Sequence, residues 1–71
     1  MPYARTEDLP AAQQRLPPHA QDIYRAAFNN AWTEYENRAD REAVAHRVAW
    51  AAVKHSYRKI GSRWVEIAAI G

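Results

Sequence analysis

Cysteine is absent from this 71-residue chain, which excludes disulfide bonds and thiolate metal sites. Glycine occurs only twice, so the chain lacks the residue from which phosphate-binding loops and tightly shaped pockets are usually built. No apolar run approaches the roughly 20 residues of a membrane-spanning helix, and the start MPYARTEDLP contains no apolar signal region. We therefore expect a cytoplasmic protein without a transmembrane segment.

The length and composition predict one small folded domain over residues 1–71. The chain is 48% hydrophobic and 25% charged, as is typical of folded rather than disordered proteins. A core of this size must use most of the large apolar residues. The three tryptophans, four tyrosines and one phenylalanine are accordingly expected in or around the core.

The first half of the chain predicts a short helix followed by a long one. Asp8 is expected to cap the short helix over residues 10–15, and Pro17 ends it by favouring an extended conformation before it. The long helix begins at Pro17–Pro18, because the apolar residues after it recur at three- and four-residue steps. This apolar stripe consists of Ala20, Ile23, Tyr24, Ala27, Phe28, Ala31 and Tyr35.

A second long helix carries the stretch AHRVAWAAVKHSY at 45–57. It is predicted to run from a cap at Asp40 to a stop at Gly61. One apolar side consists of His46, Trp50, Val53 and Tyr57, and the opposite side consists of Val44 and Val48. Because a helix that is apolar on two sides is covered by more than one neighbour, we expect this helix to be the central one.

The end of the chain predicts a short strand. The stretch SRWVEIAAIG alternates apolar and polar residues after Gly61, as a half-buried strand does. A lone strand needs a partner, and the extended start around Tyr3 is our hypothesis for it. The predicted fold is mainly α, a small three-helix domain of one short and two long helices with a short terminal β-ribbon.

The polar residues of the second long helix do not predict an enzyme, a cofactor or a metal ion. His46 and His55 are nine residues apart, so they point in opposite directions and lie about 13 Å apart along the helix axis. Metal-binding histidines on one helix need spacings of three or four. His46 is expected to pack beside Trp50, with one nitrogen bonded to a nearby carbonyl or carboxylate, for which Glu42 is a candidate. Ser56 cannot face the adjacent His55.

Charge is distributed unevenly along the chain, although the net charge is only +2. From residue 43 onward Glu66 is the only acidic residue, against five basic ones. The basic stripe consists of Arg47, Lys54 and Arg58, extended by Lys59 and Arg63. It is either a solvated face or a docking surface for an acidic protein segment, an anionic membrane surface or nucleic-acid phosphates.

Two tryptophans are candidates for interface anchors. Trp32 lies at the edge of the apolar stripe of its helix and is expected to be partly exposed, and Trp64 lies in the predicted strand. The alternative is that both belong to the core. The predicted partner-binding residues are Arg47, Lys54, Arg58 and Trp32.

Four stretches of the chain and a lone tryptophan after them match the pattern of a known family. The stretches are MPY near the start, DLP at 8–10, LPPHAQDIYRAAFNNAWTEY at 16–35 and AHRVAWAAVKHSY at 45–57. They cover nearly the whole chain, which resembles the ChaB family. The resemblance implies helices with a small sheet, no catalytic residues, no cofactor, and regulation of cation transport in association with a calcium/sodium–proton antiporter.

The residues and the resemblance together leave two functions open. The first is a non-enzymatic cytosolic regulator or adaptor that docks on a protein partner, with the cytoplasmic face of a cation antiporter as the candidate. The second is a small nucleic-acid-binding protein that uses the same basic face, as proposed for some viral relatives. A purely structural role is a further alternative. The turn after Tyr35 is shorter than in many relatives, and the apolar tail VEIAAIG is expected either to cover the core or to pair between molecules.

Overall fold

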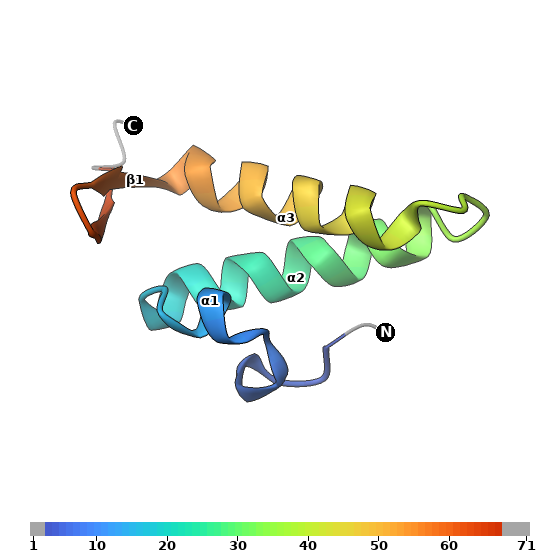
Figure 1. Cartoon of the computed structure of the whole chain (residues 1–71), viewed down its shortest axis with the longest axis horizontal. Helices are drawn as coiled ribbons and strands as arrows, with labels where there is room; N and C mark the ends of the chain where they lie inside the picture. Colours follow the sequence, from blue (N-terminus) through green and yellow to red (C-terminus); the bar gives the residue numbers. More distant parts are fainter. Residues whose placement is uncertain (1–2, 68–71) are drawn as a thin grey trace.

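The computed structural model describes residues 3–67 and is mainly helical, with a small antiparallel sheet near one end of the chain. Its elements are the 3-10 turn η1 (Thr6–Asp8), α1 (Ala11–Gln14), α2 (Pro18–Glu34), α3 (Arg41–Ser56), β1 (Tyr57–Ile60) and β2 (Arg63–Glu66). The two long helices lie side by side and run in opposite directions (Figure 1). The predicted fold class is therefore confirmed. Residues 1–2 and 68–71, which include most of the apolar tail, lie outside the described residues.

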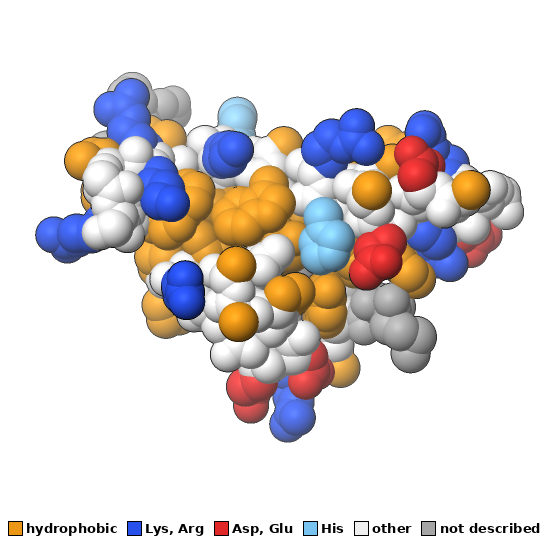
Figure 2. Space-filling model, in the orientation of Figure 1, with side chains coloured by type: hydrophobic (Ala, Val, Ile, Leu, Met, Phe, Trp, Pro, Cys, Tyr) orange, Lys and Arg blue, Asp and Glu red, His pale blue; other side chains and the backbone are white. Residues whose placement is uncertain are grey.

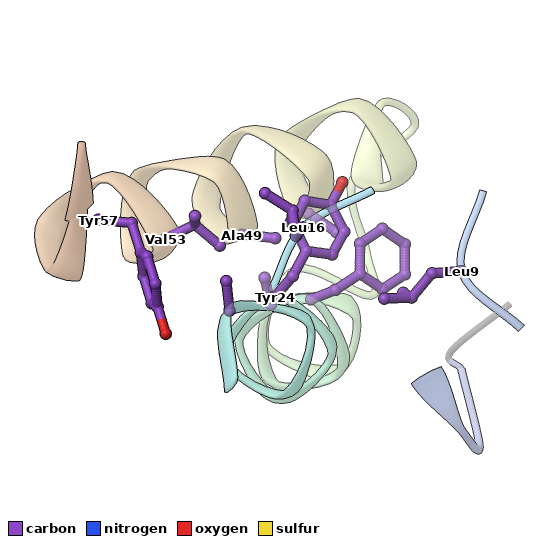
Figure 3. Close-up of a cluster of buried hydrophobic side chains, with 10 residues drawn as sticks. Leu9, Leu16, Tyr24, Ala49, Val53 and Tyr57 are labelled. Carbon is purple, nitrogen blue, oxygen red and sulfur yellow. The ribbon is translucent and has the colours of Figure 1, made fainter. Parts of the chain in front are cut away.

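Helices α2 and α3 pack through stripes of buried residues at three- and four-residue steps. The stripe consists of Ala20, Tyr24, Phe28 and Ala31 on α2, and of Ala45, Ala49 and Val53 on α3. The alanines allow the two backbones to approach closely, and the rings of Tyr24 and Phe28 fill the space that remains. Figure 3 shows Ala49 and Val53 pointing from α3 toward Tyr24. Burying each large side chain contributes about 1.5–3 kcal/mol.

The central element is α2, so the prediction that α3 is central was wrong. Helix α2 contacts α3, α1 and η1, whereas α3 buries only the side that carries Ala45, Ala49 and Val53. Val48, on the opposite side of α3, is 37% exposed to solvent. Alanines and valines made α3 apolar in sequence on two sides, but only one of those sides meets a neighbouring element.

The segment before α2 is held by two buried leucines and by two glutamine side chains. Leu9 and Leu16 belong to the core. The side-chain amide of Gln14 donates to the carbonyl of Leu9 at 2.8 Å, and that of Gln21 donates to the carbonyl of Leu16 at 2.8 Å. These bonds satisfy carbonyls at turns where no helical N–H follows. Asp8 lies in η1, and α1 begins without a side-chain cap, so the predicted cap was wrong.

The chain start packs on α2 rather than on a strand. The N–H of Tyr3 donates to Oδ1 of Asn29, and Nδ2 of Asn29 donates back to the carbonyl of Tyr3, both at 2.9 Å. The Tyr3 ring lies against Phe28 with 4.8 Å between ring centroids. The backbone N–H and C=O of Tyr3 therefore bond with the Asn29 side chain and not with a strand. The predicted ribbon between the chain start and the final strand was wrong.

The actual sheet is a hairpin of consecutive strands. Strand β1 pairs antiparallel with β2, and the register places Tyr57 opposite Glu66 and Ile60 opposite Arg63. Helix α3 ends at Ser56 instead of Gly61, because Tyr57 already adopts an extended backbone conformation. Residues 58–60, which were predicted to complete the last helical turn, belong to strand β1 together with Tyr57.

Gly61 makes the hairpin turn possible, and replacing it tests this role. Its φ of +62° lies in the left-handed region, whereas Ser62 beside it has a negative φ. A Cβ at Gly61 would meet no atom within 4 Å. A side chain there is therefore disfavoured only by the left-handed backbone conformation. We expect Gly61→Ala to lower the free energy of unfolding by about 1 kcal/mol in urea titrations. The matched change Ser62→Ala should alter it by less than about 0.5 kcal/mol. Equal losses for the two variants would contradict this role.

Candidate docking surface

The three predicted basic residues are exposed, but each borders a different hollow of the surface. Arg47 borders Val44 and Val48, Lys54 borders Trp50 and Trp64, and Arg58 borders Ile60 and Val65. Arg47 and Lys54 lie seven residues apart on one side of α3, whereas Arg58 lies on β1, so the predicted stripe does not continue to Arg58 as one helix face.

The end of α3 at Ser56 explains the position of Arg58. Arg58 and Lys59 lie on β1, where successive side chains point to opposite faces of the hairpin. Arg58 is paired with Val65, and Lys59 is paired with Trp64. Lys59, which the sequence placed only as an extension of the stripe, thus joins Lys54 beside Trp64.

Trp32 is half-buried, as predicted, but its ring is already in contact with other side chains. The Arg41 guanidinium lies 3.9 Å from the ring centroid and donates to the Trp32 carbonyl at 2.8 and 3.2 Å. The Phe28 ring is stacked on the same indole with 5.8 Å between centroids. These contacts leave only part of the indole accessible to a partner. Nothing in the local sequence indicated the contact with Arg41, because it joins two helices.

Asp40 occupies the position before α3, as predicted, but its side chain does not cap the helix. Its carboxylate instead accepts hydrogen bonds from Arg38 at 2.9 and 3.1 Å. The hydrogen-bonded Arg38 guanidinium holds the pKa of the Asp40 carboxyl below its usual range. The pair is exposed to solvent, so it contributes little to stability.

Two tryptophans and three basic side chains form a surface between α1, α3 and the hairpin. Trp50 and Trp64 are both half-buried, and their rings are stacked with 5.9 Å between centroids and 23° between planes. Lys54, Lys59 and Arg15 border the hollows around this stack. Figure 2 shows apolar side chains on this face with blue basic groups around them. We call these five residues the tryptophan surface.

The tryptophan surface was only partly predicted. Trp50, which was expected in or around the core, packs against the core but is only half-buried. The sequence gave no reason to bring Arg15 near either tryptophan. The alternation of a hairpin over residues 57–66 was the signal that could have placed Lys59 beside Trp64.

His46 bonds with a tyrosine rather than with Glu42, which corrects the predicted partner. The Tyr24 hydroxyl accepts a hydrogen bond from Nε2 of Gln13 at 2.9 Å and lies in hydrogen-bond contact with Nδ1 of His46. Burial raises the pKa of the Tyr24 phenol. This network satisfies a hydroxyl within the core and gives His46 a packing role beside Phe28.

Two kinds of functional element are not found among residues 3–67. No group of three or more histidine, aspartate and glutamate side chains is arranged to hold a metal ion. Over the same range, no helix has both the length and the apolar character required to cross a membrane.

A comparison with family models matches most of the chain. The ChaB family model covers residues 9–66, from Leu9 between η1 and α1, through both long helices, to the final residue of β2. The chain belongs to the ChaB family. The resemblance expected from the sequence is therefore confirmed.

Relatives and a solved structure agree with this assignment. The chain is 53% identical over 66 residues to the "putative cation transport regulator ChaB" of Escherichia coli K12, covering 83% of this chain and 87% of the relative. The same figures hold for the protein of that name from Shigella flexneri. The NMR solution structure of a ChaB protein so named superposes with a TM-score of 0.82 at 47% identity. That match covers 94% of this chain and 100% of the solved one. The ChaB fold described above is therefore shared with an experimental structure.

Proposed function

We propose that this ChaB protein is a non-enzymatic regulator that acts by docking on a protein partner. The names of its relatives support a role in regulating cation transport. The observation that carries the docking mechanism is the tryptophan surface, where two stacked indoles remain partly exposed with basic side chains at their border. Large aromatic rings supply binding energy at protein interfaces, and charges at the border orient the partner.

The proposed partner is the cytoplasmic face of a cation antiporter, and the proposed location of the ChaB protein is the cytoplasm. In this scheme the antiporter moves the ions and the ChaB protein alters its rate. The exposed cations of α3 and the hairpin, Arg47, Lys54, Arg58, Lys59 and Arg63, suit a partner surface rich in carboxylates.

Docking can be measured with a purified calcium/sodium–proton antiporter in lipid nanodiscs and in vesicles. We expect saturable binding of the ChaB protein to the nanodiscs, and a changed rate of cation–proton exchange when the protein faces the cytoplasmic side. Empty nanodiscs and vesicles with an unrelated transporter are the controls. No binding and an unchanged exchange rate at saturating protein would refute the antiporter as partner.

A second candidate function is binding of single-stranded nucleic acid. It is favoured by one observation: an indole stack bordered by lysines resembles the platforms on which bases stack in single-strand-binding proteins. Fluorescence anisotropy with labelled single- and double-stranded DNA, at low and at physiological salt, separates the two candidates. Binding that weakens steeply with salt, and that is lost when Arg47, Lys54 and Arg58 are all changed to alanine, would favour nucleic acid.

A further inference from the structure

The tryptophan surface is assembled from α3, from the hairpin that directly follows it, and from Arg15, which is distant from both in the sequence. Trp50 and Lys54 come from α3, Lys59 and Trp64 come from the hairpin, and Arg15 follows α1. Two adjoining hollows share Trp50, Lys59 and Trp64, so the five side chains border one continuous surface. The two indoles stack on each other and leave part of each ring open to an incoming side chain.

The charge of this surface has one sign. Of its side chains, Arg15, Lys54 and Lys59 are basic, and no carboxylate is among the described residues that border the hollows. In the described part of the chain, none of these three cations is in an ion pair, whereas Arg38 is paired with Asp40. The Lys59 ammonium lies 5.9 Å from the Trp64 ring centroid, where it can contact both the ring and an anion.

The arrangement of these cations fits a short anionic segment better than a long polyanion. The three basic groups come from separate elements, Lys54 from α3, Lys59 from β1 and Arg15 from the turn after α1, instead of following one helix face. Acidic side chains occur on other parts of the same face (Figure 2), where a long nucleic-acid strand would meet repulsion. With a net charge of only +2, the protein also has little long-range attraction for a polyanion.

We propose that the tryptophan surface binds a short acidic protein segment that places one large apolar side chain against Trp50 and Trp64. The carboxylates of the segment pair with Lys54, Lys59 and Arg15. This inference rests on the proposed docking function and gives the chemistry of the partner. The apolar side chain supplies most of the binding energy, and the ion pairs set the orientation.

The test is an NMR titration of the whole isotope-labelled protein with designed peptides. The chain has three tryptophans, so their indole N–H signals, assigned with single Trp→Phe variants, report separately on the tryptophan surface and on Trp32. The probe is a peptide that alternates glutamate and glycine around one phenylalanine. We expect it to shift the Trp50 and Trp64 signals while the Trp32 signal stays in place.

Matched changes in the peptide and in the protein make the test specific. A peptide with glutamine for glutamate, or alanine for phenylalanine, should bind at least about fivefold more weakly. The double variant Lys54→Gln, Lys59→Gln should weaken binding of the acidic peptide by about fivefold to tenfold. Arg5→Gln removes one positive charge from an exposed position before η1, outside this surface, so it should leave affinity unchanged.

Several outcomes would overturn the proposal. These are equal binding of the glutamine peptide, equal loss of affinity from Arg5→Gln, movement of the Trp32 signal alone, or no response to any peptide. Shifts of Trp50 and Trp64 with a thymidine oligonucleotide but not with the acidic peptide would assign the surface to nucleic acid. Shifts that depend on protein concentration without a peptide would assign it to a second copy of the chain.

The antiporter experiment separates this proposal from the proposed function. If the acidic peptide binds but the antiporter does not, the surface is correct and the partner is wrong. If the antiporter binds the double lysine variant as tightly as the unchanged protein, docking is correct and the tryptophan surface is wrong.

Discussion

Phe28→Ala is expected to unfold most of the protein at 25 °C. The Phe28 side chain is fully buried, and its ring centroid lies 4.7 Å from that of His46, 4.8 Å from that of Tyr3 and 5.8 Å from that of Trp32. Removing it leaves a cavity that these rings cannot fill without leaving their other contacts. Such a change costs about 3–5 kcal/mol, which is comparable to the total that a core of this size supplies.

Far-UV circular dichroism and urea titration measure this effect. Loss of most helical signal without denaturant is the expected result for Phe28→Ala. The control Phe28→Leu keeps an apolar side chain at the site, and we expect it to remain folded with a lower urea midpoint. A helical spectrum and a loss of less than about 1 kcal/mol for Phe28→Ala would show that this residue is not essential to the core.

The second large effect is expected from enlarging an alanine at the interface of the two long helices. Ala49 is fully buried on the side of α3 that faces α2, between Ala45 and Val53. Leucine has no room there unless the helices separate, so we expect Ala49→Leu to lower the free energy of unfolding by about 1–3 kcal/mol or more. The midpoint of urea unfolding measures the loss.

The same substitution two residues later provides the control. Ala51 lies on the exposed side of α3, and alanine and leucine have similar helix propensities. Ala51→Leu should therefore change the free energy of unfolding by no more than about 0.5 kcal/mol. If Ala49→Leu proved equally harmless, the close approach of α2 and α3 would not determine stability.

The sequence predicted that the basic residues are exposed, but it did not predict which of them share a surface. Arg47 and Lys54 were correctly expected to be exposed on α3, and Arg58 was correctly expected to be exposed. Their common surface depended on α3 continuing to Gly61. The helix ends at Ser56. After it, successive side chains point to opposite faces of a strand instead of following the periodicity of a helix. One change of element therefore moved Lys59 to Trp64 and separated Arg58 from Lys54.

The order and type of the helices followed from the sequence by itself. Apolar residues at three- and four-residue steps, Pro17–Pro18 before α2 and the polar turn before Asp40 are local signals, and each acts over only a few residues. The half-buried state of Trp32 could be predicted for the same reason, since its position on the helix surface depends only on helical periodicity.

Contacts between distant residues were decided by the tertiary structure. Asn29 rather than a strand holds Tyr3, Tyr24 rather than Glu42 bonds with His46, and α2 rather than α3 is central. The tryptophan surface belongs to this class, since Arg15, Lys54 and Lys59 come together only when α1, α3 and the hairpin pack. Periodicity determines which side of an element is apolar, but several partners can cover that side. Only the packing of all elements together selects which partner does.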